Sequence, residues 1–189
     1  MTPPDLTASL AGHEVRRASV PILATERLLL RGHTADDFDS CCRLWSNPEV
    51  TRNITGRPST PDETWRRMLA YAGHWSFMGF GYFLVTEQGT GAVVGEVGLA
   101  DFRRTMTPSF GTTPEAGWII DPQFQGRGLA AEAVSAVLAW AGQTMPRTVC
   151  LINPDNYPSL RLAHRLGYRE YARTDGDHSA ILLERPPPV

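Results

Sequence analysis

Residues 115–130, Glu-Ala-Gly-Trp-Ile-Ile-Asp-Pro-Gln-Phe-Gln-Gly-Arg-Gly-Leu-Ala, contain the transition that decides the fold. Residues 115–120 have the apolar and aromatic side chains of a strand, and the pair Asp121-Pro122 ends it. Across residues 129–141 apolar side chains recur at helical spacing, which predicts a helix of about three to four turns. A strand, a glycine-containing turn and an amphipathic helix therefore follow one another directly.

The turn between this strand and helix has the properties of an anion site. Unpaired N–H groups of the first helical turn point to one place, where the helix dipole adds positive charge. Gly126 and Gly128 allow the main chain to approach a phosphate closely, and Arg127 can add a charge-assisted contact. The turn is neither a P-loop nor a dinucleotide-binding GxGxxG. The alternative is that the two glycines only make a tight turn.

On both sides of this stretch, the sequence pattern predicts short strands and helices. The first two predicted helices begin with capping-box patterns. The predicted order is strand 28–30, helix 38–45 ended by Pro48, helix 60–75, strands 82–86 and 92–99, loop 101–114, strand 115–120, helix 129–141, strand 148–152, helix 159–166, and strands 168–172 and 178–183. Strands gather before and after a single strand–helix–strand crossover. The fold class is therefore α+β, or mixed α/β, with a mixed sheet.

Composition excludes several classes of protein. The net charge is −2 and the sequence pI is about 6.2, so no basic field indicates a nucleic-acid or membrane partner. Cys41, Cys42 and Cys150 have no metal-binding spacing, and we expect reduced thiols and no metal. Residues 1–23 predict a loosely attached arm and residues 186–189 a tail, around one domain over 24–185. Without a secretion signal or a membrane span, we expect a cytosolic protein.

Three motifs in this order resemble the GNAT superfamily of N-acetyltransferases. Gln125, Gly128 and Ala130 fill its pyrophosphate-loop pattern, Gln/Arg-x-x-Gly-x-Gly/Ala. Residues 115–122 resemble the central strand of the branch that contains the RimJ and RimL acetylators of ribosomal-protein N-termini. Asn156-Tyr157-Pro158-Ser159, followed by Leu166-Gly167-Tyr168, resembles the Asn-x-x-Ser and Leu-Gly-Phe/Tyr elements of the same branch. The resemblance covers residues 24–185 and implies the GNAT fold, a central, mostly antiparallel mixed sheet flanked by helices.

The resemblance also implies acetyl-CoA as co-substrate and a set of residues that bind it. The part of the strand from Gly117 to Ile120 would separate from its neighbour, pair its main chain with the pantetheine arm and aim a backbone N–H at the thioester oxygen. Asn156 would bind the amide arm, or alternatively only cap its helix. The coenzyme-binding residues implied are Trp118, Ile119, Ile120, Gln125, Gly126, Arg127, Gly128, Leu129, Ala130, Asn156 and Ser159.

For catalysis the resemblance suggests a carboxylate base and an acid for the leaving thiolate. Glu115, at the start of the separated strand, is the first candidate for general base, and Glu96 is the second. The alternative for Glu115 is a solvated carboxylate at the strand end. Superfamily members often use a tyrosine acid on the last helix, whereas this chain has Ala163 and His164 there. That departure favours Ser159, unless its hydroxyl only bonds the backbone.

The acceptor implied is a primary amine, either on a small molecule or at a protein N-terminus. Its wall would include Trp45, Asn53, Trp65, Trp75, His178 and the loop 101–114, although most of these aromatic residues are expected in the core. Two other functions stay open: a non-catalytic acyl-CoA sensor or scaffold, and a nucleic-acid-binding domain that lacks the usual basic stripe. The sequence does not separate a monomer from a homodimer.

Overall fold

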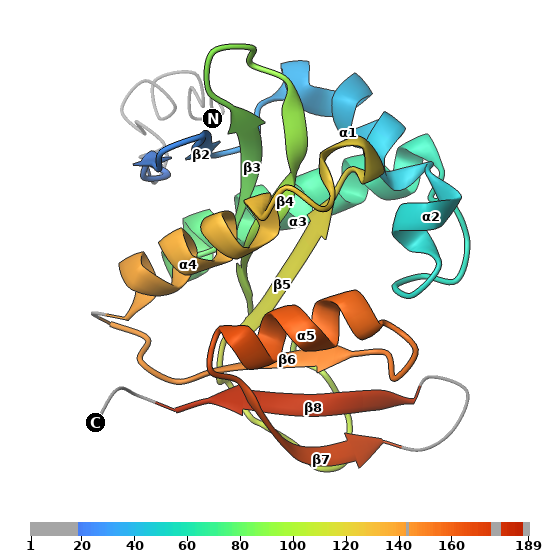
Figure 1. Ribbon diagram of the computed structural model, residues 1–189, viewed down its shortest axis with the longest axis vertical. Helices are drawn as coiled ribbons and strands as arrows, with labels where there is room; N and C mark the ends of the chain where they lie inside the picture. The colour runs from blue at the N-terminus through green and yellow to red at the C-terminus, as the bar shows by residue number, and fades with distance from the viewer. Residues whose placement is uncertain (1–18, 143, 175–178, 187–189) are drawn as a thin grey trace, which may run out of the picture.

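The computed structural model describes residues 19–142, 144–174 and 179–186. Its strands form one eight-stranded sheet in the order β1-β2-β3-β4-β5-β6-β8-β7. Among them β5 and β6 are parallel and the other neighbours are antiparallel, which confirms a mixed, mostly antiparallel sheet with one crossover. The strands are β1 Leu23–Ala24, β2 Leu28–Arg31, β3 Tyr82–Glu87, β4 Val93–Ala100, β5 Glu115–Ile120, β6 Thr148–Ile152, β7 Arg169–Thr174 and β8 Ala180–Arg185 (Figure 1).

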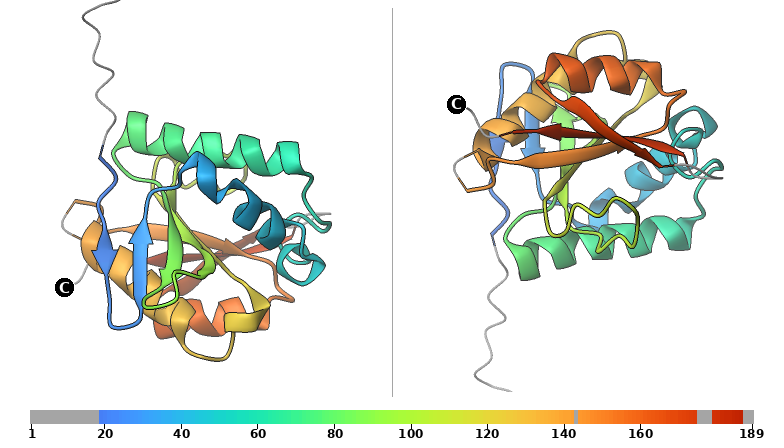
Figure 2. Two further views of the ribbon diagram at one scale, coloured as in Figure 1. Left: turned by 90° about the horizontal axis from the view of Figure 1, so that it is seen from above. Right: turned by 90° about the horizontal axis from the view of Figure 1, so that it is seen from below.

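The helices cover both faces of this sheet. Helices α1 and α3 lie on one side, while α4 and α5 lie on the other (Figure 2). We call these the α1/α3 face and the α4/α5 face. The helices are α1 Phe38–Trp45, α2 Pro48–Thr51, α3 Pro61–Met78, α4 Leu129–Ala141 and α5 Tyr157–Arg165, with 3-10 turns η2 Ala35–Asp37 and η3 Pro122–Phe124.

Local chemistry caps both ends of helix α3. The Thr60 side chain accepts a hydrogen bond from the backbone N–H of Glu63, and the Glu63 carboxylate accepts one from the N–H of Thr60. Pro61 occupies the first helical position, where its missing N–H costs nothing. The helix ends at Gly79, whose φ of 73° is the left-handed conformation that favours glycine. The start was therefore predicted, whereas the helix continues past residue 75, its predicted end, to Met78 before this glycine.

Among the predicted boundaries that shift, three change how an element is assigned. Pro48, expected to end the first helix, instead opens α2, because Asn47 caps it and proline suits the first helical position. Helix α5 begins at Tyr157 rather than Ser159, with Asn156 as its cap. The sheet already includes Leu23, which the sequence assigned to the arm. Residues 1–18, the tail 187–189 and the predicted strand start at 178 lie outside the described residues.

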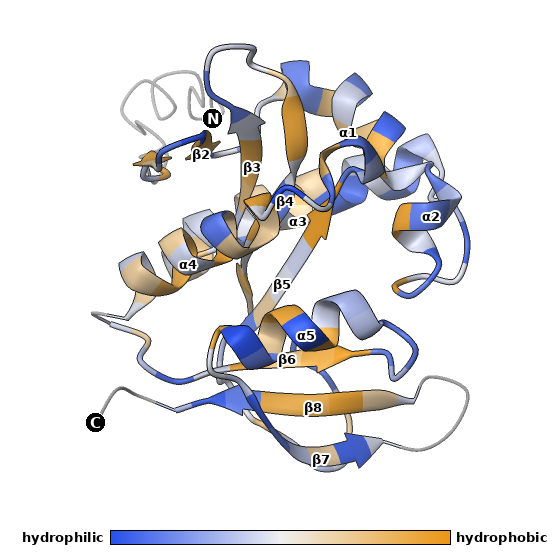
Figure 3. Ribbon diagram, viewed as in Figure 1, coloured by the Kyte–Doolittle hydropathy of each residue, from blue (hydrophilic) through white to orange (hydrophobic). Residues whose placement is uncertain are grey.

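Helix α4 is held by apolar packing on the α4/α5 face. Its side chains at Ala133, Val134, Val137 and Leu138 are buried in the main core with residues of β3, β4 and β5. Figure 3 shows the apolar character of this helix. Each fully buried valine or leucine contributes about 1.5–3 kcal/mol, so the helix is fixed at the end of β5. Among the described helices none has the length and apolarity needed to cross a bilayer.

Strands β5 and β6 meet at one end and then separate. Glu115 and Val149 form the register pair between them, and the N–H of Val149 also bonds the carbonyl of Pro114. Farther along, residues 117–120 pair only with β4 among the described strands. The expected separation of β5 from its neighbour is confirmed, and it leaves a backbone edge without a partner strand.

Candidate active site

The connection from β5 to α4 is a tight turn made by two glycines. Gly126 and Gly128 have φ values of 73° and 77°, in the left-handed region that side chains disfavour. The Asp121 carboxylate accepts a hydrogen bond from the N–H of Gln123, and Nε2 of Gln125 donates to the carbonyl of Ile120 at 3.1 Å. The Gln125 side chain thus stabilises the turn from inside.

The first turn of α4 has no side-chain cap. Gly128 is the N-cap residue, and the first intrahelical bond runs from the N–H of Glu132 to the carbonyl of Gly128 at 3.2 Å. A helix of 13 residues with an uncapped start concentrates positive dipole charge there. Leu129 is buried and Ala130 half-buried, so these two residues offer their backbone rather than their side chains to a ligand.

An arginine that the sequence analysis did not single out adjoins this turn. Nε of Arg27 donates to Oε2 of Glu132 at 2.7 Å, and its Nη1 donates to the carbonyl of Arg127 at 2.9 Å. Burial alone would raise the pKa of Glu132, but contacts with Thr25 and Arg27 lower it. The sequence Thr-Glu-Arg-Leu at residues 25–28 is the local signal that could have marked Arg27. Arg27 therefore ties the segment before β2 to the start of α4, where Glu132 balances its charge.

The side chain of Arg127, expected to add a phosphate contact, is already paired. Its Nη2 lies 2.6 Å from Oε1 of Glu87, at the end of β3. Its guanidinium carbon also lies 5.5 Å from the ring centre of Phe124. Nearly half of the side chain is exposed, so solvent weakens the ion pair with Glu87. A phosphate would have to compete with Glu87 for this guanidinium.

The separated part of β5 faces α5 through Trp118 and Ser159. Nε1 of Trp118 donates a hydrogen bond to Oγ of Ser159 at 3.2 Å. The Asn156 side chain accepts from the backbone N–H of Ser159 at 3.2 Å, which is the local capping role considered as the alternative. Ile119 and Ile120 are buried, so on this strand they present main-chain groups.

The first candidate base, Glu115, is buried and bound by an arginine from the loop 101–114. Nη2 of Arg104 donates to Oε1 of Glu115 at 2.8 Å, and Nε of Arg104 bonds the other oxygen. Only 7% of Glu115 is exposed. Such a two-point pair is strong and directional, so neither oxygen is free of Arg104. This contact spans residues 11 apart and was not foreseen.

The second candidate, Glu96, lies at the centre of a buried polar cluster on the α1/α3 face. Nε1 of Trp45 donates to its Oε2 at 3.0 Å, and Nε2 of His33 lies 3.3 Å from its Oε1. The side chains of His33 and Glu96 are 4% and 0% exposed. Burial alone would raise the pKa of Glu96, but contacts with His33, Trp45 and Cys41 lower it. Glu96 is therefore ionised at neutral pH.

Tyr82 connects the two carboxylates to the separated strand. Burial, then the charges of Glu115 and Glu96, raise the pKa of the Tyr82 phenol. Its ring stacks on Tyr71 with centres 4.5 Å apart. A Cβ placed on Gly117 would lie 1.9 Å from the Tyr82 Oη, so the phenol rests directly on the strand. Sequence analysis named neither tyrosine, because nothing local marks them.

The same cluster offers donor atoms suited to a metal ion. One ligand atom each from His33, Cys41 and Glu96 lie within 4.8 Å of one another. Burial raises the pKa of the Cys41 thiol, with the Glu96 charge as the next cause, so this sulfur is a neutral thiol in the metal-free cluster. The expectation of no metal stays a prediction.

Other residues expected around the acceptor divide between surface and core. Trp65 is 40% exposed and packs edge-on against Phe38. Trp75 is buried and packs against Phe83 and Trp140, so it belongs to the core. His178 lies outside the described residues.

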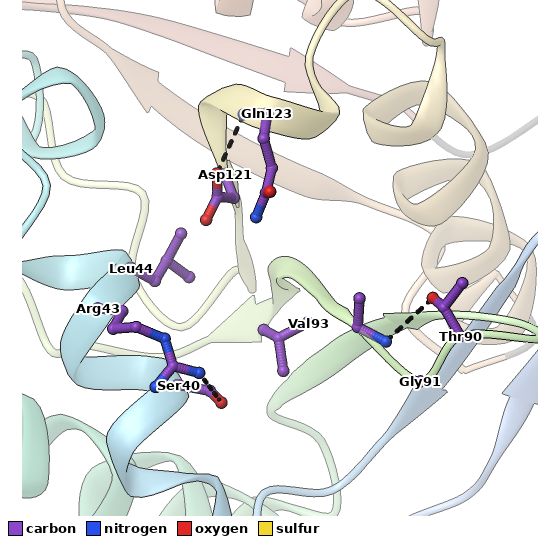
Figure 4. A pocket seen from close by; sticks show the side chains of 9 residues that line it. Ser40, Arg43, Leu44, Thr90, Gly91, Val93, Asp121 and Gln123 are labelled. Carbon is purple, nitrogen blue, oxygen red and sulfur yellow. Dashed lines mark hydrogen bonds between the residues drawn. The ribbon is translucent and has the colours of Figure 1, made fainter.

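A separate cavity of about 340 Å³ lies next to the β5–α4 connection. Figure 4 shows Asp121 and Gln123, from that connection, and Leu44, from α1, on its walls. The turn after β3 contributes Thr90 and Gly91. None of the residues predicted to bind the coenzyme or to catalyse lines this cavity.

Comparisons with known proteins agree on one family. Residues 27–169 match the family model described as acetyltransferase (GNAT) domain. An uncharacterized N-acetyltransferase, p20, from Bacillus licheniformis is 28% identical over 163 residues, covering 82% of this chain and 89% of that protein. A solved GnaT-family acetyltransferase from Bordetella pertussis is 36% identical with a TM-score of 0.78, covering 87% of this chain and 99% of that one.

The fold is also shared with a more distant protein. RimL, a ribosomal L7/L12 alpha-N-protein acetyltransferase solved in complex with coenzyme A, has a TM-score of 0.73 at 14% identity. The alignment covers 88% of this chain and 98% of RimL. At this identity the likeness concerns the fold, which the two proteins have in common.

Proposed function

The chain belongs to the GNAT acetyltransferase family and is an N-acetyltransferase, and from this premise we propose that it moves an acetyl group from acetyl-CoA to a primary amine by direct attack. The observation that carries the proposal is a juxtaposition. An unpaired edge of β5, residues 117–120, leads through η3 and the two-glycine turn into the uncapped first turn of α4. A ligand with an extended amide chain joined to a diphosphate matches both features: the amide chain fits the strand edge, and the diphosphate fits the start of the helix.

For the carrier, we assign main-chain contacts. The diphosphate would accept hydrogen bonds from the N–H groups that open α4, where Gly126 and Gly128 allow close approach. Arg27, which bonds the carbonyl of Arg127 and is paired with Glu132, would hold this turn in position. The pantetheine amides would pair with the free edge of β5 as a further strand does. RimL, which shares the fold, was solved with coenzyme A, and this supports the assignment.

For the base, we favour Glu96 over Glu115. Arg104 bonds both oxygens of Glu115, whereas Oε1 of Glu96 has no hydrogen bond of good geometry to the described residues. Glu96 also pairs across the sheet with Ile119 of the separated strand, so it stands beside the place proposed for the thioester. The ionised carboxylate would take a proton from the ammonium form of the acceptor.

For the acid, we propose Ser159. The indole N–H of Trp118 donates to its Oγ, so the hydroxyl proton of Ser159 stays available as a donor. The amine nitrogen bonds the acetyl carbon, the carbon–sulfur bond breaks, and the sulfur receives this proton. The proton that the nitrogen loses as it becomes an amide would return to Oγ of Ser159, which restores the hydroxyl. A thiol with a pKa near 8.5 is a fair leaving group, so the acid contributes modestly.

The test measures binding and turnover separately. Titration calorimetry with coenzyme A and acetyl-CoA should show saturable binding. A thiol-release assay should show turnover that depends on an added amine, over free amino acids, polyamines, amino sugars and short peptides. Binding without turnover on any of these amines would support the sensor alternative, and absence of binding would refute the proposal.

A further inference from the structure

Buried polar atoms without a partner gather on the α1/α3 face. In the described part of the chain, buried side-chain atoms that lack a hydrogen bond include both ring nitrogens of His33, Nη1 of Arg67 and Oε1 of Glu96. Native proteins bond about 90% or more of such groups, because an unpaired one forfeits its hydration. Nε2 of His33 and Oε1 of Glu96 face each other at 3.3 Å without good hydrogen-bond geometry, whereas Nδ1 of His33 and Nη1 of Arg67 have no hydrogen-bond partner among the described residues. This deficit in one place indicates a site completed by a ligand.

The positive half of this site is Arg67 of α3. Its guanidinium carbon lies 3.4 Å from the ring centre of Trp45, so the plane of the group is held against the indole. No ion pair joins Arg67 to an acidic side chain among the described residues, whereas Arg66 at the next position pairs with Asp62. A guanidinium with a buried, free N–H is suited to a carboxylate, whose two oxygens match its geometry.

The negative half is Glu96, held against the same indole. Trp45 supports Arg67 with its ring face and donates its Nε1 to Oε2 of Glu96, which leaves Oε1 available beside His33. The site therefore presents a cation over the face and an anion at the N–H edge of one rigid aromatic ring. An α-amino acid presents the complementary pair, an ammonium group next to a carboxylate.

The site also lies next to the strand proposed to deliver the acetyl group. Glu96 is the cross-strand partner of Ile119 in β5. Tyr82, whose phenol rests on Gly117, is close enough to Arg67 for that charge to affect its pKa, after the larger effects of burial and of the two carboxylates. An ammonium bound at Glu96 would thus have its nitrogen beside the thioester.

We propose that the acceptor is a small zwitterionic amine, an α-amino acid or a close analogue, whose carboxylate binds Arg67 and whose ammonium group binds Glu96 with His33. This inference rests on the proposed acetyl transfer. It selects against a protein N-terminus, because the first residue of a peptide carries an amide where the free amino acid has its carboxylate. Arg67 would then face a neutral group.

The experiment compares matched acceptors: each free amino acid, its α-amide, and the amine that remains after loss of the carboxyl group. We expect kcat/KM for the best free amino acid to exceed the values for its amide and its decarboxylated amine by about 100-fold. Neither of these two compounds has a carboxylate, so each would leave the buried charge of Arg67 unpaired. Arg67→Met should reduce this preference to a few-fold, and Arg67→Lys should keep part of it. Arg66→Met, on the same helix but exposed, should leave it unchanged.

Folding and acetyl-CoA affinity are measured for each variant, so that a misfolded protein is not counted. Equal rates for acid, amide and amine in the wild type would overturn the inference, as would acetylation of peptides alone; both outcomes leave acetyl transfer standing. Absence of thiol release with any amine would instead refute the proposed function. Loss of the wild-type rate in a chelator, restored by zinc, would assign His33, Cys41 and Glu96 to a metal and overturn the inference.

Discussion

The indole of Trp118 donates a hydrogen bond of 3.2 Å to the hydroxyl of Ser159, and this bond joins β5 to α5 beside the edge where β5 leaves β6. The two residues are 41 positions apart in sequence. Because a hydroxyl that accepts from an indole still has its own proton to give, Ser159 keeps a donor next to the separated strand.

Ser159→Ala tests this role directly. We expect kcat to fall by roughly 10–100-fold because the thiolate loses its proton donor, while the affinity for acetyl-CoA changes little. Ser46→Ala, at the exposed end of α1, is the matched control and should have no effect. An unchanged kcat in Ser159→Ala would leave the residue with a structural role only, as the first turn of α5 beside Asn156.

Replacing the two carboxylates separates their functions. Glu96→Gln should lower kcat/KM by about 100–10,000-fold, because the neutral amide cannot accept a proton. The lowered pKa of Glu96 keeps it ionised at neutral pH, so the wild-type rate should be lost on the acid side, where Glu96 takes up a proton and can no longer accept one from the acceptor. Glu115→Gln should chiefly lower the free energy of unfolding, since Arg104 loses its charged partner. Rates and urea midpoints are measured for both variants. A large loss of rate in Glu115→Gln, with only a loss of stability in Glu96→Gln, would make Glu115 the base.

Gly128→Val should weaken coenzyme A binding by at least about 10-fold. The side chain would stand in front of the first-turn amides that we propose bind the diphosphate. Backbone strain at a φ of 77° also costs about 1–3 kcal/mol of stability. Gly56→Val controls for that strain, since Gly56 has a φ of 73° and is exposed in another part of the chain. If calorimetry gives both variants the same affinity, the turn does not bind the carrier.

Gly117→Ala should disturb the site through one atom. The added Cβ would lie 1.9 Å from the Tyr82 Oη, so the phenol or the strand must move. We expect about 1–3 kcal/mol of destabilisation and a lower kcat. Gly73→Ala is the matched control: it lies in α3 with no heavy atom within 4 Å of its added Cβ, and should stabilise by about 1 kcal/mol. Thermal unfolding and thiol release measure the two effects.

Asp37 predicts an acid-sensitive part of the stability. Burial would raise its pKa, but hydrogen bonds from Arg31 and Thr34 outweigh burial and lower it to about 2. Because the pKa of Asp37 is lower in the folded than in the unfolded protein, its ionised carboxylate stabilises the fold above the unfolded-state pKa, near pH 4. This stabilisation is lost as the pH falls toward 2. Its size is about 2 kcal/mol. Urea unfolding of Asp37→Asn should show a flatter acid dependence, whereas Asp36→Asn, which is exposed, should match the wild type.

Local sequence determined much of the fold. The strand, glycine turn and helix of residues 115–141 were predictable because alternation, breakers and helical spacing act over a few residues. The capping box of Thr60 and Glu63 likewise marked the start of α3. Boundaries failed where a signal had two meanings: Pro48 can end one helix or open the next, and Asn47 decided for the second.

The site itself depended on tertiary structure. The sequence could nominate Glu115 and Glu96 as carboxylates of suitable type, but not that Arg104 binds the first or that Trp45, 51 residues away, donates to the second. Arg67 carried no local signal at all. Whether a side chain is paired, buried or free depends on which distant segments the sheet and helices bring beside it. Periodicity specifies the face on which a residue lies, and only packing specifies the atoms it meets there.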